Sequence, residues 1–195
     1  MKISVVGTGY VGLITALCLA IKGHEVLAVD KNEKIVKKLN RHEPHIYEEG
    51  LQDLLNTAIS LKRFNATTDL EVALSVSDIA IIAVGTPSKN GQINLSFIEK
   101  VVRDIGNYIR KNKPVSIIVK STVIPGTTDG LVKSILESTS GLRSSEIGLG
   151  MNPEFLREGS AIKDFMNPDR IIFGCEDDLI LRKFKEIYKP WNCKK

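Results

Sequence analysis

The 195-residue sequence has no apolar run long enough to cross a bilayer. Its longest apolar stretch, from Tyr10 to Ile21, has 12 residues, whereas a membrane-spanning helix needs about 20. Met1 and Lys2 lead directly into a β-branched run rather than into a cleavable leader. We therefore expect a cytoplasmic protein that has no membrane partner.

Cysteine is also scarce. Cys18, Cys175 and Cys193 are widely spaced and fit neither a CxxC metal clip nor a paired disulfide framework. The spacing predicts reduced thiols and no metal site.

Charge of one sign is not concentrated enough to indicate a nucleic-acid surface. The formal net charge is only +4. Lys31, Lys34, Lys37 and Lys38 cluster without interleaved aromatic residues, a pattern typical of a solvated helix face. We expect no nucleic-acid partner, although such a cluster would attract anionic nucleotides weakly.

Strand-like and helix-like segments alternate along the whole chain. A β-branched run at residues 3–6, a glycine turn, a helix over 11–22 and a strand over 25–29 form a right-handed βαβ unit. Further strands are predicted at 79–84, 115–119, 147–151 and 170–173, and further helices at 33–40, 50–60, 95–109, 128–137 and 179–188. The pattern predicts a Rossmann-type, doubly wound, mostly parallel α/β sheet with helices on both faces, in one domain over residues 1–195.

Gly7, Gly9 and Gly12 form a GxGxxG motif between the first predicted strand and helix. Gly7 permits a tight turn, Gly9 lets a pyrophosphate approach the backbone, and Gly12 lets the helix lie close to the strand. The helix N-terminus adds free N–H groups for the anion, so Tyr10 and Val11 join the predicted contacts. The motif indicates a dinucleotide site, the alternative being a glycine turn without a ligand.

Asp30 ends the second strand, 18 residues after Gly12. A carboxylate there can accept hydrogen bonds from the adenosine ribose hydroxyls and would repel a 2′-phosphate, which favours NAD over NADP. Lys31 could offset that repulsion, and a strand-end or helix-capping acid is the structural alternative. We include Lys31 and the residue at position 35, Ile35, among the predicted cofactor contacts.

A second turn follows the predicted strand 79–84. Val84-Gly85-Thr86-Pro87 lies at a carboxyl strand end, where ligands of open α/β sheets collect. Val84, Thr86 and Pro87 are therefore predicted contacts of the nicotinamide side, and an ordinary turn is the alternative.

Further segments resemble one family of sugar-nucleotide dehydrogenases. They are VGTGYVG at 6–12, IYEEGL at 46–51, KSTV at 120–123, NPEFLREGSA at 152–161 and NPDR at 167–170. With these motifs the sequence resembles the NAD-binding half of the UDP-glucose/GDP-mannose dehydrogenase family across essentially the whole chain. Gly159, after Arg157 and Glu158, resembles the UDP-glucose branch rather than the GDP-mannose or UDP-N-acetylhexosamine branches.

The resemblance implies oxidation of UDP-glucose to UDP-glucuronate, with two NAD per turnover, through a cysteine thioester. It implies that Glu154 acts on the water that attacks the thioester, that Glu158 shapes the sugar pocket, and that Thr122 holds the reacting oxygen or a catalytic water. Glu154 and Glu158 would share a face if Pro153 opened a helix, and two exposed acids are the alternative. The residues that would lie along the substrate are Phe155, Leu156 and Arg157.

The resemblance also has departures. The family places its catalytic cysteine in a second half beyond residue 195, so the chain alone is expected to be inactive, and the complete protein to be a homodimer or larger. The three cysteines here are predicted to be core or surface thiols. In 123–126 the proline comes one place later than in many members, which leaves the shape of that turn open. The competing interpretations are a stand-alone NAD-binding module and another two-domain dehydrogenase, of the hydroxyacid or phosphogluconate type.

Overall fold

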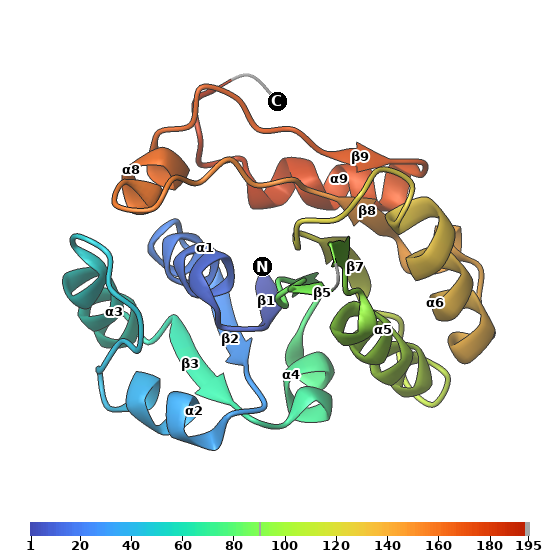
Figure 1. Ribbon diagram of the computed structural model, residues 1–195, viewed down its shortest axis with the longest axis horizontal. Helices are drawn as coiled ribbons and strands as arrows, with labels where there is room; N and C mark the ends of the chain where they lie inside the picture. The colour runs from blue at the N-terminus through green and yellow to red at the C-terminus, as the bar shows by residue number, and fades with distance from the viewer. Residues whose placement is uncertain (90, 194–195) are drawn as a thin grey trace.

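The computed structural model describes residues 1–89 and 91–193 and places seven strands in one sheet, in the order β3-β2-β1-β4-β7-β8-β9 (Figure 1). All neighbouring strands run parallel except β8 and β9. The strands are β1 (Lys2–Val6), β2 (Glu25–Val29), β3 (Phe64–Thr67), β4 (Ile79–Ile82), β7 (Ser116–Val119), β8 (Leu149–Met151) and β9 (Gly174–Cys175), and a separate hairpin joins β5 (Ser88–Lys89) to β6 (Gln92–Ile93). This order confirms the predicted Rossmann-type fold.

Helices cover both faces of the sheet (Figure 1). One face carries α1 (Tyr10–Ile21), α2 (Glu33–Asn40), α3 (Leu51–Ser60), α8 (Ala161–Met166) and α9 (Asp178–Ile187). The other carries α4 (Leu70–Val76), α5 (Ser96–Ile109), the π-helix η1 (Thr128–Val132), α6 (Lys133–Ser140) and the short α7 (Ser144–Ile147).

Strand β4 shows why its sequence is apolar throughout. Ile79 and Ile81 belong to the core on the α1 face, whereas Ala80 and Ile82 belong to the core on the α5 face. A central parallel strand is buried on both sides and therefore has no polar alternation. The chain order reverses between β1 and β4, which opens a crevice beyond their carboxyl ends.

The structure corrects the predicted last strand at 170–173. Arg170 makes only an isolated bridge, residues 171–173 are not in a strand, and the strand β9 begins at Gly174. In β9, Cys175 pairs with Gly150 of β8, whose position has no room for a side chain because an added Cβ would lie 2.7 Å from Phe184. Residues 171–173 form an irregular segment that leads into β9.

Two predicted elements have different bounds in the structure. The predicted helix 128–137 is divided into η1 and α6, and the predicted strand 147–151 begins only at Leu149 because Gly148 ends α7 with a φ of 85°. Strand β3 and helix α4 were not predicted at all.

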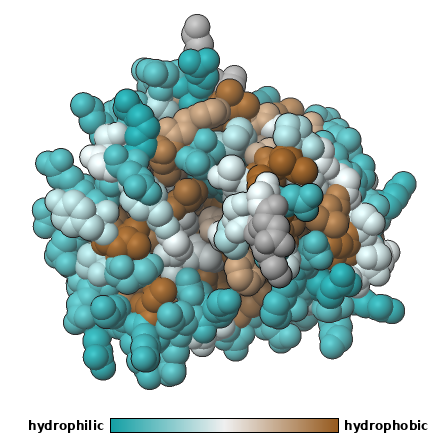
Figure 2. All heavy atoms as spheres, viewed as in Figure 1, coloured by the Kyte–Doolittle hydropathy of each residue, from teal (hydrophilic) through white to brown (hydrophobic). Residues whose placement is uncertain are grey.

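Within the described residues, no helix is long and apolar enough to cross a membrane. On the face seen in Figure 2, apolar residues form separate patches among hydrophilic ones.

Candidate functional site

The glycine loop lies between β1 and α1, and its glycines have different surroundings. A Cβ on Gly7 would lie 2.7 Å from the carbonyl oxygen of Ala83, and one on Gly12 would lie 1.9 Å from that of Gly7. Gly9 has nothing within 4 Å of its added Cβ. Gly7 and Gly12 thus close the turn, while Gly9 leaves open space at the start of α1. No acidic residue occupies the first turn of α1, so its N–H groups can bind a phosphate.

Asp30 fixes the glycine loop from the end of β2. Its Oδ2 accepts hydrogen bonds from the Thr8 backbone N–H at 3.1 Å and the Thr8 hydroxyl at 2.6 Å, and its Oδ1 accepts from Asn32 N–H at 2.9 Å. Asn32, not Asp30, is the N-cap of α2. A carboxylate has about four acceptor sites, so Asp30 keeps room for one further donor such as a ribose hydroxyl.

Lys31 and Ile35, two further predicted cofactor contacts, have different surroundings. The Lys31 ammonium lies 4.6 Å from the ring centroid of Phe97. Ile35 is partly buried and packs against the core of the α1 face, so it offers no polar group to a nucleotide.

The nicotinamide-side residues come together at the ends of β4 and β7. The Thr86 hydroxyl donates to the Thr122 carbonyl at 2.8 Å, and the Ser121 hydroxyl donates to the Val84 carbonyl at 2.7 Å. The Thr122 side chain is exposed, as is Pro87. These bonds join two segments more than 30 residues apart, which sequence reasoning treated separately.

The turn after Thr122 is ordinary despite its displaced proline. The Ile124 carbonyl accepts from Thr127 N–H at 3.2 Å, with Pro125 and Gly126 between them. Gly126 has a φ of 84°, and a proline followed by a positive-φ glycine is typical of a type II turn.

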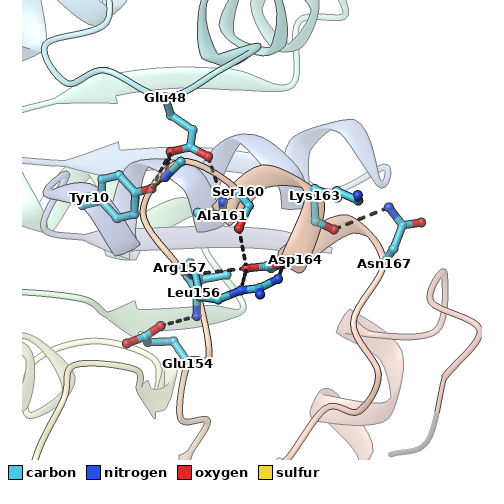
Figure 3. A network of polar contacts seen from close by, with 11 residues as sticks. Tyr10, Glu48, Glu154, Leu156, Arg157, Ser160, Ala161, Lys163, Asp164 and Asn167 are labelled. Atoms are coloured by element: carbon cyan, nitrogen blue, oxygen red, sulfur yellow. Dashed lines mark hydrogen bonds and ion pairs between the residues drawn. The ribbon is translucent and has the colours of Figure 1, made fainter.

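Residues 152–160 form an irregular loop rather than a helix, and α8 begins only at Ala161. Glu154 and Glu158 therefore do not share a helical face. The Glu154 carboxylate accepts the backbone N–H of Leu156 at 2.6 Å (Figure 3), which holds one of its oxygens and leaves the other available. Phe155 is 60% exposed, and Glu158 is exposed as well.

Arg157 folds back onto α8. Its guanidinium binds Asp164 through Nη2–Oδ1 at 2.7 Å and Nε–Oδ2 at 3.0 Å (Figure 3). The hydrogen bonds from Arg157 are the main reason that the pKa of Asp164 is lowered to about 2. Sequence reasoning missed Asp164, because no local pattern identified its partner.

Glu48 joins three segments of the site. This buried carboxylate accepts the Tyr10 hydroxyl and the backbone N–H groups of Gly159 at 2.9 Å and Ala161 at 2.7 Å (Figure 3). Burial opposes its ionisation, but these hydrogen bonds outweigh burial and hold the pKa of Glu48 below its ordinary value. The segment 46–51 and the loop 152–160, which the family resemblance singled out separately, thus meet at one carboxylate.

A cavity of about 530 Å³ lies between the loop 152–157 and the returning limb 167–172. At its base, Lys120 Nζ donates to Asn152 Oδ1 at 3.0 Å, the Tyr188 hydroxyl donates to the same oxygen, and Asn152 Nδ2 donates to the Ile172 carbonyl at 2.7 Å. Lys120 is only 3% exposed. Burial lowers its pKa to about 8, although the negative charge of Glu154 acts in the opposite direction.

The cysteines show no sign of activation. Cys18 is buried in α1, and burial raises its pKa to about 12. Burial also raises the pKa of Cys175, with Asp177 and Asp178 adding to the effect, and Cys193 is partly buried against the core. Among the described residues, no group of three or more His, Cys, Asp and Glu side chains could hold a metal ion.

Comparisons with known proteins agree with this geometry. The family model for the UDP-glucose/GDP-mannose dehydrogenase family, NAD binding domain, matches residues 1–192. A GDP-mannose 6-dehydrogenase from Pseudomonas putida is 41% identical over 97% of this chain and 45% of its own length.

Two solved structures show the same arrangement. A GDP-mannose dehydrogenase from Pseudomonas aeruginosa, crystallised as a ternary complex, superposes with a TM-score of 0.95 at 41% identity, covering 100% of this chain and 45% of its own. A UDP-glucose dehydrogenase from Pyrobaculum islandicum gives a TM-score of 0.93 at 40% identity, covering 99% and 45%.

The chain spans less than half the length of these three relatives. The family match over residues 1–192, the glycine loop and the order of the strands point to one conclusion. The chain belongs to the UDP-glucose/GDP-mannose dehydrogenase family, of which it is an NAD-binding domain.

Proposed function

We propose that residues 1–195 are the cofactor domain of an enzyme that oxidises the C6 alcohol of a nucleotide-linked hexose to a carboxylate, with two NAD per turnover. The observation that carries the proposal is the meeting of the glycine loop, the Thr86–Thr122 contact and the Glu154 loop beyond the carboxyl ends of β1, β4, β7 and β8. Ligands of this fold bind at that edge.

The residues present fit a bound NAD. The open space at Gly9 and the first turn of α1 would receive the pyrophosphate, and Asp30 would accept from the adenosine ribose. Thr86 and Thr122 would lie near the nicotinamide. NAD supplies the acceptor for hydride.

Glu154 would serve the hydrolytic step. One of its oxygens is held by Leu156 N–H, and the other can take a proton from an attacking water. Glu158, Phe155, Leu156 and Arg157 would lie along the sugar, with the Arg157 side chain held by Asp164 unless the substrate displaces it. The cysteine that forms the thioester would belong to another part of the protein, because burial raises the pKa of Cys18 and Cys175 and so disfavours their thiolates.

Two substrates are candidates. UDP-glucose is favoured by Gly159 after Arg157 and Glu158, and GDP-mannose is favoured by curated relatives of that name at 41 to 42% identity. UDP-glucose dehydrogenases reach nearly the same identity, 39 to 40%. We keep UDP-glucose as the first candidate and GDP-mannose as the second.

The test uses the full-length protein with UDP-glucose, GDP-mannose and a UDP-N-acetylhexosamine, following NADH by absorbance. Two NADH per sugar and a uronate product would support the proposal, and the ratio of kcat/KM would identify the sugar nucleotide. NADH from a hydroxyacid or phosphogluconate instead would overturn it. NAD binding without any turnover would favour a stand-alone NAD-binding module.

Two further parts of the proposal concern the complete protein. We place it in the cytoplasm and expect a homodimer or a larger oligomer, as the family resemblance implies. Light scattering on the full-length protein would measure its mass in solution, and a monomer would contradict the expectation.

A further inference from the structure

One buried ammonium joins the two segments that carry the proposed catalytic side chains. Lys120 lies at the end of β7, two residues before Thr122, and its Nζ binds the side chain of Asn152, two residues before Glu154. Asn152 is itself 3% exposed and is the acceptor for both Lys120 and Tyr188. Together with the backbone bond from the Asn152 N–H to the Val119 carbonyl at 2.9 Å, this side-chain contact holds the start of the Glu154 loop against the end of β7.

A buried ammonium such as that of Lys120 is a costly way to make a purely structural contact. Moving an ammonium out of water costs several kcal/mol, and Lys120 has one hydrogen-bond acceptor for its three donors. The face of the Phe165 ring, 5.6 Å from Nζ, supplies the other favourable contact. An apolar side chain of the same length would fill this space at less cost.

The charged groups around Lys120 differ in whether they are already paired and in how strongly they act on its ammonium. Arg157 and Asp164 line the cavity but pair with each other. Asp169 and Arg170 also line the cavity, and both are exposed to solvent. Glu154 is the charge that acts on Lys120 most directly, although no ion pair joins them within the described residues.

We propose that Lys120 is a positioning residue, which holds Asn152 and thereby fixes the start of the loop that carries Glu154 relative to the end of β7, where Thr122 lies. The inference rests on the proposed function and extends it to a residue to which that function assigns no role.

The test compares Lys120→Met with Lys183→Met in the full-length protein. Lys183 is a matched control, because it is also partly buried and binds β7, but at the opposite end, through Ser116 Oγ at 2.9 Å and the Asp78 carbonyl. Burial lowers its pKa as well. Loss of either lysine disturbs packing against β7, but only Lys120 lies beside Glu154.

We expect Lys120→Met to lower kcat by as much as roughly 100-fold, the effect of a small misplacement of a catalytic group. The KM for NAD should stay unchanged, because the glycine loop is not involved. In Lys183→Met, both kcat and the KM for NAD should stay close to the wild-type values. Equal kcat values for the two variants, or a KM for NAD that changes together with kcat in Lys120→Met, would overturn the proposal.

A second measurement separates this inference from the proposed function. If the wild-type protein oxidises no nucleotide-linked hexose, the proposed function fails, and crystal structures of the wild-type and Lys120→Met proteins decide the positioning role. A Glu154 loop displaced relative to Thr122 in the variant would support it. An unmoved loop would refute it.

Discussion

Glu48→Gln tests the carboxylate that ties the segment 46–51 to the start of α8. In the native chain, Oε1 accepts from Ala161 N–H, and Oε2 accepts from Gly159 N–H and the Tyr10 hydroxyl. Glutamine has one acceptor oxygen and one donor group. If the amide nitrogen takes the place of Oε1, the Ala161 N–H is left facing a donor. If it takes the place of Oε2, the Gly159 N–H keeps only its longer bond to the Tyr10 hydroxyl, at 3.3 Å.

A buried donor without an acceptor costs about 1–3 kcal/mol, and the charge contribution is lost as well. We therefore expect Glu48→Gln to lower the free energy of unfolding of the 195-residue chain by about 2–3 kcal/mol, measured by urea unfolding near neutral pH. Glu49→Gln is the matched control, since Glu49 is the exposed neighbour of Glu48 and should change stability by no more than about 0.5 kcal/mol.

The sign of the pH dependence follows from the lowered pKa of Glu48. Its contribution is present above the ordinary value of 4.5 and is lost as pH falls through the lower folded value. The difference between wild type and Glu48→Gln should therefore shrink in acid. Equal stability of Glu48→Gln and Glu49→Gln at neutral pH would refute the assigned role.

Three other predictions can be checked directly. Asp30→Ala should weaken NAD binding by about 1–3 kcal/mol, measured by calorimetry, and an unaltered affinity would move the ribose contact elsewhere. Glu154→Gln in the full-length protein should bind NAD normally but hydrolyse the thioester slowly in rapid-quench experiments, and unchanged turnover would remove Glu154 from the mechanism. Burial lowers the pKa of His24 below its ordinary 6.5, so its contribution to stability is present above that value and is lost as pH falls toward the folded pKa. The midpoint of thermal unfolding of wild type should consequently fall more steeply in mild acid than that of His24→Gln, and parallel curves would contradict this.

The sequence was sufficient for the elements that carry strong periodicity. β1, α1, β2 and the glycine loop combine a β-branched run, an apolar helix and a recognisable motif, so pattern and packing agree. β3 was missed because its residues FNAT contain only two buried side chains, Phe64 and Ala66. Its strand conformation depends on pairing with β2, which no local signal reveals.

The site was predictable where single segments act alone, and not where distant segments meet. The motifs placed Gly9, Asp30 and Thr122 at carboxyl strand ends, as the fold requires. The two backbone partners of Glu48 lie 111 and 113 residues away in the sequence. Lys120, similarly, looks like an ordinary strand-end lysine until the fold buries it beneath the loop that contains Glu154.

The close approach of Gly7 to Ala83 has a further consequence. Gly7 follows β1 and Ala83 follows β4, so this contact sits on the seam between the two mononucleotide-binding halves of the sheet. A Cβ at position 7 would lie only 2.7 Å from the Ala83 carbonyl oxygen. Any larger residue there would therefore push the ends of β1 and β4 apart. The width of the cofactor crevice is therefore set inside the core, and an exchange at position 7 would alter cofactor affinity and sheet cohesion together.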